Sequence, residues 1–132
     1  MQRELGAKNA VAFDIGAACS GFLFALNTAY SYLKSGQYQT ALILGAETLS
    51  KMMDWEDRST CVLFGDGAGA AIVRNMPDEE GIGIESLVQG SDGAKGMVLA
   101  CKGRPVKNPY VETEEERMSY VTMDGQEVYK FA

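Results

Sequence analysis

The strongest constraint on the fold is a run of small residues, Gly16-Ala17-Ala18-Cys19-Ser20-Gly21, between two apolar segments. Before it, Asn9–Ile15 is a short apolar run typical of a buried strand. After it, apolar side chains recur at three- and four-residue spacing up to Ser35-Gly36, which predicts a helix that is apolar around most of its circumference and therefore buried. A further apolar run, Tyr38–Ala46, predicts a second buried strand. This order favours a right-handed parallel βαβ unit, and hence an α/β fold.

The rest of the chain alternates short apolar runs with loop signals. Met1–Leu5 has the composition of a helix end, with Gly6 as its stop signal. Residues 47–60 are polar and predict a surface loop, and residues 90–117 hold glycines, prolines and the acidic run Glu112–Glu116, which predicts a solvated face. A helical pattern begins at residue 125. The additional predicted strands are Cys61–Phe64, Ala68–Arg74, Ile82–Gln89 and Tyr120–Met123.

The amino-acid composition and net charge argue against several classes of protein. The chain has 132 residues, 46% hydrophobic and 23% charged, which is ordinary for one globular domain. Its net charge is −6 and it has no basic run, so we expect no nucleic-acid partner. No apolar run approaches the roughly 18 residues of a membrane span, and the charged N-terminus does not resemble a secretory signal. We therefore expect no membrane association and a cytoplasmic location.

The numbers of cysteines and histidines limit the disulfides, metal sites and catalytic partners that this chain can provide. Three scattered cysteines argue against a disulfide framework. There is no histidine and no C-x-x-C pair, so we expect no metal site. Nucleophilic cysteines usually recruit an imidazole. This chain does not supply one.

Cys19 is the candidate nucleophile. Small neighbours let backbone and substrate approach its sulfur, and the N-terminus of the following helix directs N–H groups and partial positive charge toward it. Those N–H groups can also stabilise the oxyanion that forms when a thioester is attacked. The alternative, that Cys19 is a small core residue at a helix start, stays open at this point. Cys61 is expected in the core and Cys101 in a loop.

Several segments together resemble the β-ketoacyl-acyl-carrier-protein synthase III family, which starts bacterial fatty-acid synthesis and belongs to the thiolase superfamily. They are Asp14–Phe22 (DIGAACSGF), Gly45–Thr48 (GAET), Asp57–Thr60 (DRST), Phe64–Ala70 (FGDGAGA) and Met123–Ala132 (MDGQEVYKFA). Their order and spacing make the resemblance specific. It implies a part of a thiolase-like fold, with a mixed β-sheet packed on a buried helix, and it makes Gly65–Ala70 a tight turn between strands and not a phosphate loop.

The resemblance also implies a domain organisation. Residues 1–90 would form the end of the N-terminal half with the nucleophile turn, residues 91–118 a connecting loop region, and residues 119–132 the truncated start of the C-terminal half. The chain is thus expected to be an internal fragment. The histidine and asparagine that complete the family's catalytic site would lie outside it, and the fragment alone is expected to be inactive.

Roles for individual residues follow from the same resemblance. Cys19 would accept the acetyl group of acetyl-CoA, and Arg58 would pack against the CoA adenine. Met123, Val128 and Tyr129 would line the tunnel for the pantetheine arm. Lys130 would meet the acidic carrier protein.

The residues alone leave other interpretations open for these positions. Arg58 could form a surface ion pair with Asp57 or Glu56. The three tunnel residues could be ordinary core, and Lys130 a solvated lysine.

The implied activity is decarboxylative condensation of acetyl-CoA, or another short acyl-CoA, with malonyl-acyl carrier protein through acyl-Cys19. No cofactor is expected, since the CoA thioester is a substrate. A homodimer is expected through antiparallel pairing of the strand around Asn9–Ile15. Three alternatives remain: another thiolase-superfamily condensing enzyme that primes polyketide or branched-chain synthesis, a cysteine hydrolase with an α/β-hydrolase elbow, and a non-catalytic scaffold or interaction fragment.

Overall fold

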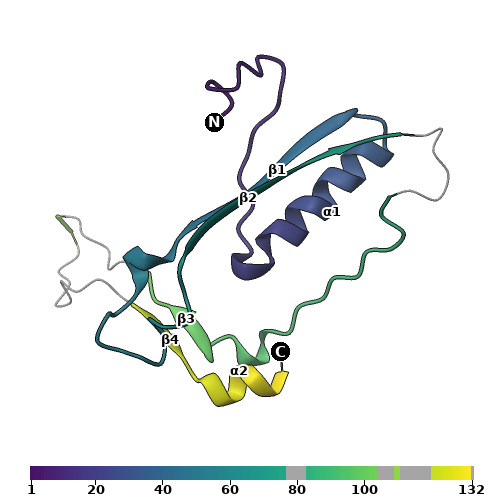
Figure 1. Cartoon of the computed structure of the whole chain (residues 1–132). Helices are drawn as coiled ribbons and strands as arrows, with labels where there is room; N and C mark the ends of the chain where they lie inside the picture. Colours follow the sequence, from purple (N-terminus) through teal and green to yellow (C-terminus); the bar gives the residue numbers. More distant parts are fainter. Residues whose placement is uncertain (77–82, 104–108, 111–119, 132) are drawn as a thin grey trace. The chain divides into compact units, whose positions relative to one another are not determined.

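The computed structural model describes residues 1–76, 83–103, 109–110 and 120–131 (Figure 1). The chain divides into two compact units, one formed by Met1–Gly45 and Gly69–Leu87 and the other by Ala46–Ala68 and Val88–Ala132. The predicted division at residues 90 and 118 concerns the halves of a complete fold and stays a prediction. The helices and strands are η1 (Ala18–Ser20), α1 (Gly21–Lys34), β1 (Thr40–Thr48), η2 (Leu49–Met52), β2 (Asp66–Arg74), η3 (Gly93–Lys95), β3 (Leu99–Cys101), β4 (Val121–Met123) and α2 (Gly125–Phe131).

Helix α1 and strand β1 form where the hydrophobic pattern predicts them. The helix ends at Lys34, and Gly36 adopts a φ of +76°, a left-handed conformation that glycine takes without steric cost. Strands β1 and β2 make a two-stranded sheet. The Asn75 N–H donates to the Gln39 carbonyl at 3.0 Å, which joins the end of β2 to the start of β1 and makes the pair antiparallel.

Helix α1 packs along residues 40–45 and 69–74 of this sheet (Figure 1). A Cβ on Gly45 would lie 3.5 Å from Cδ2 of Phe22, an ordinary van der Waals distance, so the start of the helix lies directly beside this part of β1. At the other end of the helix the Tyr32 ring packs edge-to-face on Tyr38, with centroids 5.4 Å apart, and the Asn75 side chain donates to the Leu33 carbonyl at 3.2 Å. The buried apolar residues here are Ala29, Leu33 and Ile43.

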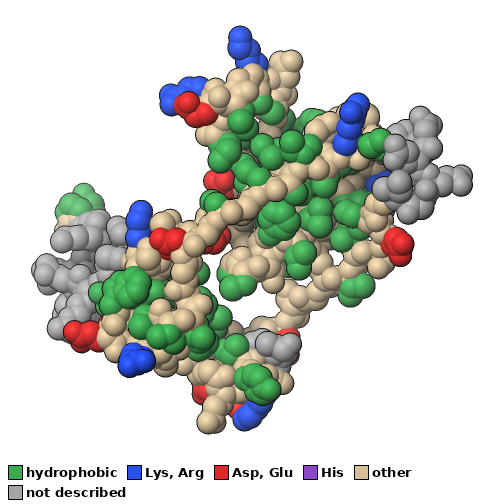
Figure 2. All heavy atoms as spheres, viewed as in Figure 1, with side chains coloured by type: hydrophobic (Ala, Val, Ile, Leu, Met, Phe, Trp, Pro, Cys, Tyr) green, Lys and Arg blue, Asp and Glu red, His purple; other side chains and the backbone are tan. Residues whose placement is uncertain are grey.

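The predicted burial of helix α1 is observed only in part, at Ala29 and Leu33. Leu23 is 60% exposed and Phe22 is 36% exposed. Figure 2 shows hydrophobic side chains gathered on the surface around α1. The sheet covers one side of the helix, and the apolar pattern on its other side has no covering layer among the described residues. The thiolase-like α/β character of the chain nevertheless holds.

Three predicted strands are absent from the described residues. Asn9–Ile15 forms no ladder, so the parallel βαβ unit is not formed, and residues 83–89 form none either. Cys61–Phe64 is a run of turns, in which the Leu63 and Phe64 N–H groups donate to the Thr60 carbonyl at 3.0 and 3.3 Å. An apolar run becomes a strand only where a neighbouring strand supplies hydrogen-bond partners, and hydrophobic pattern does not reveal that neighbour. Met1–Leu5 likewise makes a single turn and no helix.

In the second unit, strands β3 and β4 pair antiparallel, with Leu99 opposite Met123 and Cys101 opposite Val121. The predicted strand Tyr120–Met123 and the helix from residue 125 are confirmed, whereas β3 lies in a segment predicted as loop. Asp124 begins α2, because its carboxylate accepts the Glu127 N–H at 3.1 Å. The run Glu112–Glu116 lies outside the described residues. No helix in the described part of the chain is long and apolar enough to cross a bilayer.

Substituting Gly36 with alanine should lower the free energy of unfolding by about 1 kcal/mol, because an alanine at a φ of +76° is strained even though nothing lies near its Cβ. Urea denaturation of the two proteins measures the difference. Gly90→Ala is the matched control, since Gly90 also has open space around it and no positive φ. Equal losses at both positions would contradict the assignment of strain to Gly36.

Candidate active site

Cys19 lies in the short turn η1, between the extended residues 10–17 and helix α1. The turn is closed by two backbone hydrogen bonds, from the Ser20 N–H to the Ala17 carbonyl at 3.1 Å and from the Gly21 N–H to the Ala18 carbonyl. The Cys19 side chain is exposed and is not packed into a core. The thiol therefore sits immediately before the N-terminus of a helix and is open to a substrate, as nucleophilic chemistry requires.

Within this turn, Ala18 has the unfavourable backbone conformation. Its φ is +44°, and it is the only non-glycine residue with a positive φ in the described part of the chain. Such a conformation is rare for a residue with a Cβ and is least unfavourable when the side chain is small. The run of small residues before Cys19 thus lets the backbone reverse sharply from an extended segment into a helix.

Arg58 lies in a second turn, in the unit that contains η2 and β3. The Asp57 carboxylate accepts the Ser59 N–H at 2.9 Å and the Ser59 hydroxyl at 2.6 Å through Oδ1, and the Thr60 hydroxyl at 3.0 Å through Oδ2. These hydrogen bonds, those of Ser59 first, lower the pKa of Asp57 below its usual value of 3.8.

The Arg58 side chain is exposed, and no residue described in the structure forms an ion pair or hydrogen bond with it. The surface ion pair with Asp57 or Glu56, which the sequence left open, is therefore not formed. A guanidinium without an internal partner is available to an anionic or planar ligand.

Strand β2 confirms the predicted strand Ala68–Arg74 but begins two residues earlier, so Asp66–Ala70 of the glycine-rich segment lies in a strand and not in the predicted tight turn. Strand β2 begins at Asp66, whose carboxylate accepts the Ser50 N–H at 2.8 Å and the Ser50 hydroxyl at 2.7 Å. These two bonds lower the pKa of Asp66 below 3.8, the backbone bond contributing most. The Asp66 carboxylate thus ties the start of β2 to the segment that follows β1.

The three predicted tunnel residues and Lys130 lie on β4 and α2. Met123 and Val128 are half-buried, whereas Tyr129 is 87% exposed, so none of the three is ordinary core. The Lys130 ammonium pairs with the Glu127 carboxylate at 2.6 Å and is not simply a solvated charge. Cys19 belongs to the first unit of the chain, and Arg58, Met123, Val128, Tyr129 and Lys130 belong to the second.

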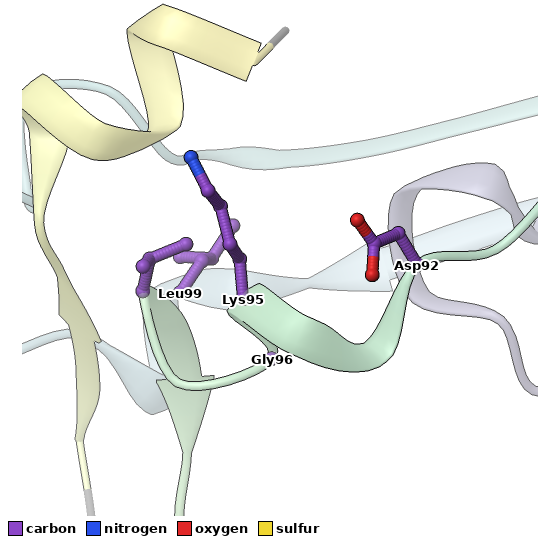
Figure 3. Close-up of a pocket in the computed structure, with 5 residues that line it drawn as sticks. Asp92, Lys95, Gly96 and Leu99 are labelled. Carbon is purple, nitrogen blue, oxygen red and sulfur yellow. The ribbon is translucent and has the colours of Figure 1, made fainter.

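One hollow in the second unit is lined by Asp92, Lys95, Gly96, Val98 and Leu99 (Figure 3). Asp92 accepts the Ala94 N–H at 2.9 Å, and the Lys95 side chain extends toward α2, where it pairs with Glu127 at 3.4 Å. Both charged groups are therefore engaged within the protein. The hollow contains no nucleophile, and no group of three or more metal-ligating side chains occurs among the described residues. The hydrogen bonds of Asp57 beside Arg58 were not predicted from the sequence. Their signal is the Asp-x-Ser spacing of an Asx turn.

Comparisons with known proteins agree on one family. A family model described as 3-oxoacyl-[acyl-carrier-protein (ACP)] synthase III matches residues 13–93. The β-ketoacyl-[acyl-carrier-protein] synthase III of Clostridium acetobutylicum is 52% identical over 132 residues, which are 100% of this chain and 40% of that protein. The chain therefore spans about 40% of the length of the curated relatives that it matches.

Solved structures that resemble this chain include members of the same family. The 3-oxoacyl-[acyl-carrier-protein] synthase III of Aquifex aeolicus superimposes with a TM-score of 0.82 at 42% identity, covering 99% of this chain and 37% of that one. The priming β-ketosynthase of the R1128 polyketide biosynthetic pathway has a TM-score of 0.84 at 38% identity, covering 98% of this chain and 37% of that one. These likenesses confirm the thiolase-like fold and the resemblance from which the site residues were predicted.

The left-handed conformation of Ala18 predicts an asymmetric response to substitution. Ala18→Gly should leave the alkylation rate of Cys19 by iodoacetamide nearly unchanged, whereas Ala18→Val should lower it roughly several-fold, because a β-branched residue does not tolerate a positive φ and would displace the thiol from the helix start. Peptide mass spectrometry measures the rate, with Cys101 as the internal reference. Equal rates for the valine and glycine variants would show that the turn does not hold the thiol.

Proposed function

The chain belongs to the 3-oxoacyl-[acyl-carrier-protein] synthase III family, and on that premise we propose that the complete protein condenses acetyl-CoA with malonyl-acyl carrier protein through a thioester on Cys19. The observation that carries the proposal is the exposed Cys19 thiol at the start of α1. A thiol in that position can be acylated, whereas a core cysteine cannot.

In the first half-reaction, the Cys19 sulfur attacks the carbonyl carbon of acetyl-CoA. The carbonyl oxygen becomes an oxyanion, which backbone N–H groups near the start of α1 are suited to stabilise. Collapse of this intermediate breaks the carbon–sulfur bond to CoA, and the CoA thiolate leaves and takes up a proton. The product is acetyl-Cys19, a reactive thioester, because sulfur both attacks and leaves readily.

In the second half-reaction, malonyl-acyl carrier protein replaces CoA. The malonyl carboxylate leaves as carbon dioxide, and its electron pair forms a carbanion that attacks the acetyl carbon. Breaking the bond to Cys19 releases acetoacetyl-acyl carrier protein and restores the thiol. The histidine and asparagine donors for the enolate belong to parts of the complete protein outside this chain.

Substrate binding is proposed for residues of the second unit. Arg58 contacts the adenine nucleotide of CoA, supported by its exposed guanidinium, for which the described residues provide no partner. Met123, Val128 and Tyr129 line the path of the pantetheine arm. Lys130 meets the acidic carrier protein, and to do so its ammonium must exchange Glu127 for a carboxylate of the partner.

The complete protein is proposed to act as a cytoplasmic homodimer, without a cofactor beyond its CoA thioester substrate. The lack of strand pairing and the exposure of Asn9–Ile15 support the proposed homodimer. This segment has no strand partner among the described residues, and Val11 and Phe13 are 64% and 56% exposed. An unpaired apolar edge is suited to pairing with the same segment of a second copy.

A second candidate function is priming of polyketide synthesis. Its support is the likeness to the R1128 priming β-ketosynthase, whose TM-score of 0.84 is similar to the 0.82 of the Aquifex aeolicus synthase III, at 38% against 42% identity. The two functions differ in the acyl-CoA that loads the cysteine, and incubation of the complete protein with several acyl-CoAs separates them by mass spectrometry.

Replacing Cys19 with serine should abolish the covalent acetyl adduct that forms when the complete enzyme is incubated with acetyl-CoA. A hydroxyl in this turn is a much weaker nucleophile than a thiol. Intact-protein mass spectrometry detects the adduct, with Cys61→Ser and Cys101→Ser as matched controls that should keep it. An adduct that survives Cys19→Ser and maps to another residue would overturn the assignment.

Replacing Arg58 with alanine should raise KM for acetyl-CoA roughly 10-fold with kcat little changed, as expected when a ground-state binding contact is lost. KM for acetyl-pantetheine, which lacks the nucleotide, should not change. Steady-state kinetics of the complete enzyme with both substrates measure this. A parallel rise for both substrates would place Arg58 elsewhere than at the nucleotide.

A further inference from the structure

We propose that Asp57 is a positioning residue, whose carboxylate holds the turn that presents the Arg58 guanidinium to the CoA nucleotide. The inference rests on the proposed role of Arg58. It adds a residue that neither composition nor family resemblance assigned. It also explains why an arginine flanked by carboxylates on its N-terminal side stays available for a ligand.

The Asp57 carboxylate holds the turn on both sides of Arg58. Asp57 directly precedes Arg58, and Ser59 directly follows it. The Asp57 Oδ1 atom accepts both the backbone N–H and the hydroxyl of Ser59, at 2.9 and 2.6 Å. One carboxylate oxygen therefore spans the arginine and fixes the backbone before and after it.

This turn is anchored to the interior through Thr60. Thr60 is completely buried, with 0% of its surface exposed, and its hydroxyl donates to Asp57 Oδ2 at 3.0 Å. The Asp57 carbonyl also accepts the Thr60 and Cys61 N–H groups, at 3.2 and 3.0 Å. The backbone that carries Arg58 is thus tied to a buried residue, while the arginine side chain itself remains exposed.

The negative charge of Asp57 is used within the turn and not in an ion pair with Arg58. Asp57 is the nearest carboxylate to Arg58 in sequence, but both of its oxygens are directed to Ser59 and Thr60. These bonds lower the pKa of Asp57, so their contribution is fully present above the usual value of 3.8 and is lost as pH falls through the lower folded value. At neutral pH the carboxylate is ionised and engaged, and the guanidinium is left for an external ligand.

The test is steady-state kinetics of the complete enzyme with acetyl-CoA and with acetyl-pantetheine. Asp57→Ala should raise KM for acetyl-CoA roughly 5-fold and leave kcat and KM for acetyl-pantetheine unchanged. Asp57→Asn should restore most of the affinity, because its carbonyl oxygen still accepts both Ser59 bonds. An Asp57→Ala variant with unchanged KM for acetyl-CoA would overturn the inference, as would an equal rise for both substrates.

A double-mutant cycle separates this inference from the role of Arg58. If Asp57 acts through Arg58, Asp57→Ala should have no further effect on KM for acetyl-CoA once Arg58 is alanine. An effect that persists in the Arg58→Ala background would refute positioning while leaving the role of Arg58 intact. If Arg58→Ala alone leaves KM for acetyl-CoA unchanged, the proposed nucleotide contact fails, and this inference fails with it.

The matched control is Asp92→Ala, which removes the same kind of bond, from a carboxylate to a backbone N–H two residues on, in a turn away from Arg58 in sequence. It should leave both KM values unchanged. If Asp57→Ala does not fold, Ser59→Ala replaces it, since it removes only the hydroxyl bond to Asp57 Oδ1. It should raise KM for acetyl-CoA by less than Asp57→Ala, and a KM at the wild-type level would overturn the inference.

Discussion

The geometry of the candidate site depends on one backbone constraint, the reversal from an extended segment into α1 at Ala18. Ala18, a residue with a Cβ, adopts a φ of +44° there, which a β-branched or bulky residue would not tolerate. The reversal brings Cys19 to the start of the helix and leaves its thiol exposed. The Phe22 side chain, in the first turn of the same helix, lies beside Gly45 of β1. The candidate nucleophile and the first helical side chain that contacts the sheet therefore both follow directly from this turn.

Aspartates organise the second unit in a comparable way. Asp57 closes the turn around Arg58, Asp66 ties the start of β2 to Ser50, and Asp124 begins α2. In each case an exposed carboxylate accepts a backbone N–H that the local structure would otherwise leave without a partner. Short loops that lack a large apolar core are thereby given defined conformations, and side chains on them can be presented to a ligand in a fixed orientation.

The exposed apolar surface fits the extent of the chain relative to its family. Leu23 on α1 and Val11 and Phe13 before it are all more than half exposed, although their pattern is that of buried elements. The chain spans about 40% of the length of its curated relatives, and the longer proteins have more chain with which to cover such a surface. Their exposure is therefore what a chain that spans only part of its family's fold would show.

The sequence by itself determined the elements whose signals are local: α1 with its stop at Gly36, strands β1 and β4, helix α2, and the small-residue turn that identifies Cys19. It failed at Asn9–Ile15, at Cys61–Phe64 and at β3, because a strand exists only where a distant segment provides hydrogen-bond partners. Only the tertiary structure decided that the Arg58 guanidinium has no partner among the described residues and that the Asp57 carboxylate turns to Ser59 and Thr60. Sequence order brings these charges together, but the direction of each side chain depends on which hydrogen bonds the folded backbone offers.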